Sequence, residues 1–175
     1  MARTFVLPKT FTPDAAARLV KRLAPETPEL TKVKVCLHPD SLWMPLDLAQ
    51  ASATTLRDTG EPVVLVSPGT IRLYKVHPLR VLFTLAHETG HIVLGHVYNK
   101  PTDAQGSIKQ ELDADVWAAR RFKALGLDMQ EPIAEYRDVA ERFPEQNNPS
   151  YVRQGSDAHP TTDERIAAIQ QAFAE

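Results

Sequence analysis

The sequence predicts an α+β protein in which a small β-sheet packs against a long helix. Residues 61–69 form an apolar run bounded by prolines, which is typical of a strand. Residues 78–94 form a longer apolar segment with helical periodicity, and residues 107–125 open with a capping-box pattern, so both are expected to be helices. At 175 residues the chain is long enough for one core and too short for two. We therefore expect a single domain spanning residues 1–175.

The first part of the chain is expected to hold short elements. Residues 3–7 are an apolar run ended by a proline, which predicts a first strand. Thr12 is suited to cap a helix that begins at Pro13. Residues 32–37 alternate between polar and apolar side chains, as a half-buried strand does. Residues 38–60 combine prolines with a polar run, so we expect an irregular surface segment there.

The remaining elements follow from capping and turn residues. The strand at 61–69 is expected to continue through residues 71–74 as a hairpin. Pro78 suits the first turn of the long helix, and Gly95 offers a place for it to end. The rest of the chain should contain a loop over 97–106, helices over 107–125 and 128–142, a long exposed loop over 143–159, and a last helix capped by Thr161 or Thr162.

Composition limits the class of protein. The chain is 43% hydrophobic and 24% charged, which is ordinary for a globular protein, and its net charge of -2 favours neither nucleic acid nor a membrane surface as a partner. There is no secretory signal and no run of about 20 apolar residues. Cys36 is the single cysteine, which excludes an internal disulfide and suits a reducing compartment. We therefore expect a soluble cytoplasmic protein, of open oligomeric state.

The expected long helix carries two histidines four positions apart, in the pattern His87-Glu88-x-x-His91. Such residues stand one turn above the other on one helix face, so both imidazoles can reach a single metal ion. Glu88 lies about 100° further round, close enough to act as a base for a water without binding the metal. The face away from the histidines would pack the helix on a core, through Leu82, Leu85, Thr89 and Ile92. This pattern predicts a zinc site.

A site of two histidines that keeps one position for water needs a third protein ligand. The candidates that follow are His96, Asp103, Glu111, Asp113 and Asp115. Glu111 is best placed, because Asp115 lies one turn further on the same helix face and both acids adjoin an apolar stripe where an unpaired carboxylate would be costly. We expect Glu111 to bind zinc and Asp115 to accept an N–H from a ligand histidine. His96 is expected to be a packing or capping residue and not a ligand. For Glu111 and Asp115, the alternative to a metal site is an ordinary solvated acidic helix face.

One more histidine precedes the last helix. Pro160 restricts His159 to extended backbone at the mouth of that helix, from which the ring could reach over the metal. The stretch by itself describes an exposed loop histidine with no role more readily than a functional one.

Together the three stretches resemble the gluzincin metallopeptidases, in particular the clan of the CAAX prenyl proteases, the HtpX-type membrane proteases and the small soluble minigluzincins. The matching residues are 85–91, 111–115, and His159-Pro160 followed by Arg165-Ile166. The resemblance implies a zincin-like fold with Glu111 as third zinc ligand and Asp115 as partner of a ligand histidine. It further implies that His159 stabilises the transition state and that Arg165 braces the site. It lies within a catalytic core at 61–175, whereas residues 1–60 match no family.

The implied activity is that of a soluble zinc endopeptidase acting on extended peptides. Zn²⁺ would be held by His87, His91 and Glu111, with Glu88 as general base. The strand at Val63–Val66 is expected at the sheet edge facing the cleft, where unpaired backbone groups can hold a substrate. The chain lacks transmembrane helices, so the prenylated or membrane substrates of the better-known relatives do not carry over.

Two other interpretations compete. The H-E-x-G-H-x-x-L-G-H form of residues 87–96 also resembles the ImmA/IrrE group, which bind or cleave transcriptional repressors, so a regulatory binding protein is the alternative function. Glu88 favours an enzyme, since a binding protein needs no base, and the His159-Pro160 pair speaks against that group. A helix bundle with an accidental motif is the third interpretation. The sequence leaves open the substrate and whether residues 38–60 or 144–158 cover the cleft.

Overall fold

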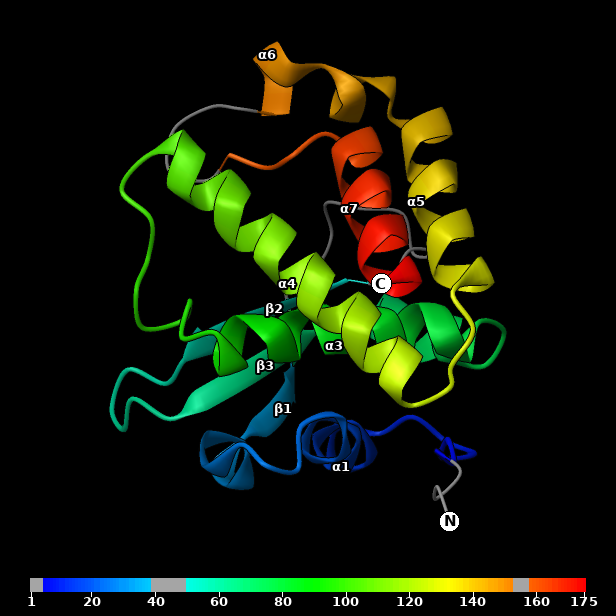
Figure 1. Cartoon of the computed structure of the whole chain (residues 1–175). Coiled ribbons are helices and arrows are strands. Elements are labelled where there is room, and N and C mark those ends of the chain that lie inside the picture. Colours follow the sequence, from blue (N-terminus) through cyan, green and yellow to red (C-terminus); the bar gives the residue numbers. More distant parts are fainter. Residues whose placement is uncertain (1–4, 39–49, 153–157) are drawn as a thin grey trace.

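The computed structural model describes residues 5–38, 50–152 and 158–175, and their fold is α+β, as predicted (Figure 1). The strands are β1 (Lys34–Leu37), β2 (Ala51–Thr55) and β3 (Pro62–Val66). The helices are α1 (Pro13–Leu23), α2 (Pro68–Tyr74), α3 (Pro78–Val93), α4 (Ala104–Ala124), α5 (Gln130–Arg142), α6 (Pro149–Val152) and α7 (Thr162–Ala174), with 3-10 turns at Pro28–Lys32 and Pro144–Asn147.

In the described residues the sheet has three strands in the order β1-β3-β2. β3 pairs in parallel with β1 and antiparallel with β2. The prediction that Val63–Val66 forms a sheet edge is therefore wrong. The cause is β2, which lies in the part of the chain expected to be irregular and occupies the edge instead.

Two further strand predictions are also wrong. Residues 71–74 do not form a hairpin with β3, because Ser67 caps α2 by accepting the Thr70 amide and Pro68 takes the first helical position. The described residues of the predicted first strand, 5–7, are not in a strand; residues 3–4 lie outside the described part.

One face of the sheet packs on α1 and α3. Val35, Val64 and Ala53 lie side by side across the strands, and the two valines are buried. α1 begins at Pro13 as predicted, with the Thr12 hydroxyl accepting the Ala15 amide. The predicted core face of α3 is confirmed by the burial of Leu82, Leu85, Thr89 and Ile92. The long helix is thus fixed between the sheet and the rest of the molecule.

The second half of the chain builds a helical layer over α3. Figure 1 shows α4 running across the middle of the molecule, with α1 and the sheet on one side of it and α5, α6 and α7 on the other. α4 begins at Ala104 with Asp103 as its cap, a turn earlier than predicted, and Thr161 closes a capping box on α7. The predicted loop at 143–159 contains the second 3-10 turn and α6. No helix of the described residues is long and apolar enough to cross a membrane.

Candidate metal centre

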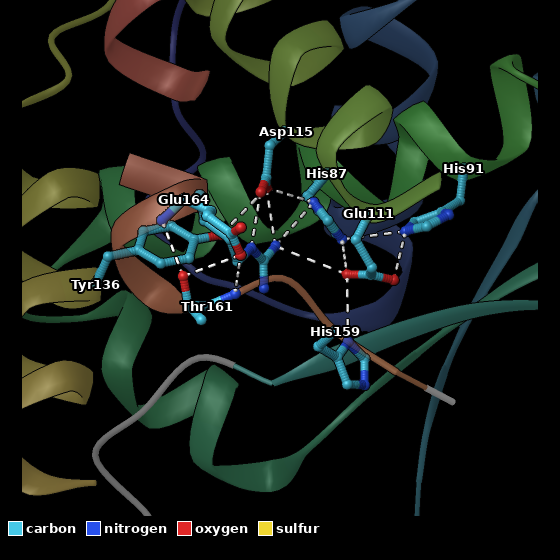
Figure 2. Close-up of polar contacts among 9 residues, drawn as sticks. His87, His91, Glu111, Asp115, Tyr136, His159, Thr161 and Glu164 are labelled. Carbon is cyan, nitrogen blue, oxygen red and sulfur yellow. Dashed lines mark hydrogen bonds and ion pairs between the residues drawn. The ribbon is translucent and has the colours of Figure 1, made fainter. Parts of the chain in front are cut away.

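Three predicted ligand side chains from two helices converge at one point (Figure 2). The Nε2 atoms of His87 and His91, one turn apart on α3, are 3.1 Å from each other. Glu111 on α4 places Oε2 3.4 Å from Nε2 of His87 and Oε1 3.3 Å from Nε2 of His91. Among the described residues, these three side chains form the one group placed to hold a metal ion.

The donor atoms are close enough together to surround one metal ion. Two ligands at about 2.0–2.1 Å from a zinc ion and a tetrahedral angle apart are separated by about 3.3 Å. The two histidine nitrogens are 3.1 Å apart, and they lie 3.4 and 3.3 Å from the two different oxygens of Glu111, so both carboxylate oxygens face the same point. Imidazole nitrogens and a carboxylate oxygen suit zinc and other first-row divalent metals, and three protein donors leave a fourth position for water or substrate.

Gly90 lets α3 and α4 approach closely enough for this convergence. A Cβ at that position would lie 3.2 Å from the Ala114 carbonyl oxygen and 3.3 Å from both the Ala114 Cα and the Trp117 ring. Two of these three atoms belong to the backbone of α4, so rotation of a side chain could not relieve the crowding. The glycine inside the histidine motif therefore serves the packing of the two ligand helices.

A buried ionic network stands behind His87. Nδ1 of His87 lies 2.8 Å from Oδ1 of Asp115, whose side chain is 0% exposed. Arg165 on α7 donates to both oxygens of Asp115, through Nε at 2.7 Å and Nη2 at 2.8 Å. Tyr136 on α5 adds a hydroxyl donor to Oδ1 at 3.3 Å, and the guanidinium lies over its ring. The Nδ1–H of His87 then donates to Asp115, which leaves the Nε2 lone pair for a metal.

The network controls the charges of the metal-free site. Burial raises the pKa of Asp115, but Arg165 and His87 lower it by more, so the carboxylate is favoured. Burial lowers the pKa of His87, but Asp115 and then Glu111 raise it by more, to about 10. The metal-free His87 is therefore an imidazolium near pH 7, and a cation bound at Nε2 would take the place of a proton.

Glu88 lies next to His87 on α3 but outside the group of donors. Its side chain is buried, and burial raises its pKa by more than the nearby histidines lower it. The backbone amide of Ala53 on β2 donates a hydrogen bond to its carboxylate. A buried carboxyl group with a raised pKa beside a metal centre is a candidate general base.

His159 reaches the centre from the segment just before α7. Its Nδ1 lies 3.7 Å from Oε2 of Glu111, and 56% of its side chain is exposed. The His159 amide donates to the Val152 carbonyl at 2.8 Å, which anchors the backbone ahead of the Thr161 capping box. Figure 2 shows the ring directed at Glu111 from the side opposite Asp115. The structure thus brings this histidine and the three predicted ligands together.

His96 and Tyr136 make contacts that the sequence analysis missed. His96 is not in the donor group, as expected, yet its Nδ1 lies 3.0 Å from Nδ1 of His91. Burial and the nearby His91 lower the pKa of His96 to about 4, so this ring is neutral near pH 7. Tyr136 had no local signal, because its contact with Asp115 depends on how α5 docks.

Comparisons with protein-family models, with curated proteins and with solved structures find no match to this chain. The resemblance to the gluzincins therefore depends on the motif residues alone.

Proposed function

We propose that this chain is a zinc endopeptidase that hydrolyses extended peptide segments. The observation that carries the proposal is the convergence of His87, His91 and Glu111 on one point beside the buried carboxyl group of Glu88. Zinc held by these three donors would polarise the scissile carbonyl and bring the pKa of water towards 7. Structural zinc sites bind with four protein ligands, so a three-donor site supports a catalytic role.

In this proposal Glu88 moves the proton. Its carboxylate takes a proton from the attacking water and passes it to the nitrogen of the leaving amine, so that one residue serves as base and then as acid. The raised pKa of Glu88 supports this role, because a base is most effective when its pKa approaches the working pH. The Ala53 amide holds the carboxylate in place between the two steps.

The outer edge of β2, which pairs with no other strand among the described residues and is called the free edge below, is proposed to hold the peptide, in place of the edge first expected at β3. At the two ends of β2, the Gln50 carbonyl accepts the Ser67 amide and the Leu56 amide donates to the Glu61 carbonyl. These even-numbered residues therefore direct their backbone groups towards β3. Because ladder bonds alternate along an antiparallel pair, the odd-numbered residues of β2 direct their amides and carbonyls to the free edge. Ala53 is one of these residues and its amide contacts Glu88. A peptide paired with this edge would therefore pass beside the proposed base.

His159 is proposed to stabilise the negative charge that develops on the carbonyl oxygen. It lies on the exposed side of Glu111, where a substrate would arrive, and its ring nitrogen can donate a hydrogen bond. Arg165 is proposed to support the site by holding Asp115 through two hydrogen bonds, and its Nη2 also lies 3.8 Å from Oε2 of Glu111.

The test combines metal analysis with cleavage of an unfolded protein substrate. Glu88→Gln should keep about one zinc per chain and lose nearly all cleavage, because the water then has no base. Glu111→Ala should lose most of the zinc. Glu141→Gln, which changes an exposed glutamate on α5, is the matched control and should behave as the wild type. Cleavage at wild-type rate by Glu88→Gln would refute the mechanism. If the wild type cleaves nothing and a partner protein is still pulled down by Glu88→Gln, a regulatory binding protein would be favoured.

A further inference from the structure

The end of α3 is built so that His96 returns to His91. Gly95 follows the last turn with a positive φ of 75°, and its amide donates to the Ile92 carbonyl at 3.0 Å. The His96 amide donates to the His91 carbonyl at 2.8 Å. This pair of bonds is a Schellman motif, in which the residue after the glycine folds back over the third residue from the helix end. That motif usually joins two apolar side chains, but here it joins two imidazoles.

The contact between these rings involves a specific pair of atoms. The two Nδ1 atoms are 3.0 Å apart and the rings are inclined at 68°, so the contact is a hydrogen bond rather than a stack. One proton lies between the two nitrogens, and one ring must donate it. If Nε2 of His91 gives its lone pair to a metal, the neutral ring carries its proton on Nδ1. His91 is then the donor, and His96 accepts at Nδ1 and keeps its own proton on Nε2.

We propose that His96 is a positioning residue for the metal: it accepts the Nδ1–H of His91 and so directs the Nε2 lone pair of His91 at the ion. His87 has an anionic partner, Asp115, in the corresponding place. The two ligand histidines are thus held by partners of different charge. The proposal rests on the zinc centre of the proposed function and does not require peptide hydrolysis.

The test measures Zn²⁺ affinity by competition with a chromophoric chelator. His96→Phe keeps a ring but cannot accept a hydrogen bond, and should weaken affinity by about 10-fold to 100-fold, the usual effect of losing such a partner. His96→Asn offers a carbonyl oxygen near the position of Nδ1 and should keep most of the affinity. Asn99→Ala removes the Asn99 side-chain bond to the Gly95 carbonyl in the same turn, and should match the wild type.

A second measurement follows the proton itself. In the zinc-loaded wild type and in His96→Asn, the His91 Nδ1–H should give a protected proton resonance, which should exchange with water in His96→Phe. Equal Zn²⁺ affinity in His96→Phe and wild type would overturn the proposal, and so would His96→Asn binding as weakly as His96→Phe. A wild-type chain that binds no Zn²⁺ would overturn the proposed function together with this role, whereas the first two outcomes overturn the role alone. If His96→Phe does not fold, His96→Ala takes its place in the comparison.

Discussion

Arg165 holds both carboxylate oxygens of Asp115, a residue fifty positions earlier in the chain. The aspartate is 0% exposed and the arginine side chain 19% exposed, so the pair lies in the interior. Breaking such a pair is costly because the charge left behind has no solvent to stabilise it. The pair therefore ties α7 to α4 as well as supporting His87.

The first prediction concerns the stability of this pair. Asp115→Asn removes the anion that accepts both Arg165 hydrogen bonds and leaves the guanidinium only the longer 3.8 Å contact with Glu111, so it should lower the free energy of unfolding of the metal-free protein by about 3–5 kcal/mol. Urea unfolding measures the loss. Asp113→Asn removes an exposed partner of Lys109 on the same helix and should change stability by no more than about 1 kcal/mol. Equal losses in the two variants would contradict the importance given to the buried network.

The second prediction concerns the spacing of the ligand helices. Gly90→Ala adds a methyl group against the backbone of α4 and should cost about 1–3 kcal/mol of stability, as overpacking does. It should also weaken metal binding, since Glu111 lies on the helix that must move. Thermal melting of the metal-free protein and Zn²⁺ titration measure the two effects. Wild-type values in both would show that the helices do not depend on this glycine.

The third prediction concerns His159. His159→Ala should bind zinc as the wild type does and cut the rate of peptide cleavage by about 10²-fold to 10³-fold, the loss typical of one oxyanion donor. His77→Ala, at the far end of α3, is the matched control. Loss of zinc from His159→Ala would make this residue part of the metal site instead.

The fourth prediction concerns pH. The pKa of His87 is raised from 6.5 to about 10 in the folded metal-free protein, so its protonated form stabilises the fold. That contribution is fully present below pH 6.5 and is lost as pH rises towards about 10. Urea unfolding in the presence of a chelator should show falling stability across this range in the wild type and a smaller fall in His87→Gln. Parallel curves would mean that His87 has no raised pKa.

The sequence predicted the parts of the site that depend on local spacing. Two histidines one turn apart and an apolar face opposite them require only a helix, so α3 and its burial were predictable. Asp115 and Glu111 share a helix face for the same reason. The contact of His96 was also within reach, because Gly95 signals a helix end that folds the next residue back.

The order of strands in the sheet could not be predicted because the sequence of β2 gives little indication of a strand. β2 reads Ala-Ser-Ala-Thr-Thr, with no large apolar residue to mark an inward face. It forms a strand because β3 offers a partner, with Ala53 beside Val64. Because this strand was not predicted, β3 was expected to lie at the edge of the sheet. Tyr136 was beyond prediction because its position depends on how α5 packs against α7, which no local pattern encodes.

The small side chains of β2 have a consequence for selectivity under the proposed function. Ala51, Ala53 and Thr55 direct backbone groups to the free edge and offer little side-chain surface there. Binding through backbone hydrogen bonds depends on a chain being extended and unpaired, and hardly on which residues it contains. A folded protein has already paired its strands and keeps them from such an edge. The edge would therefore select its substrates by conformation, and discrimination among amino acids would have to come from other parts of the molecule.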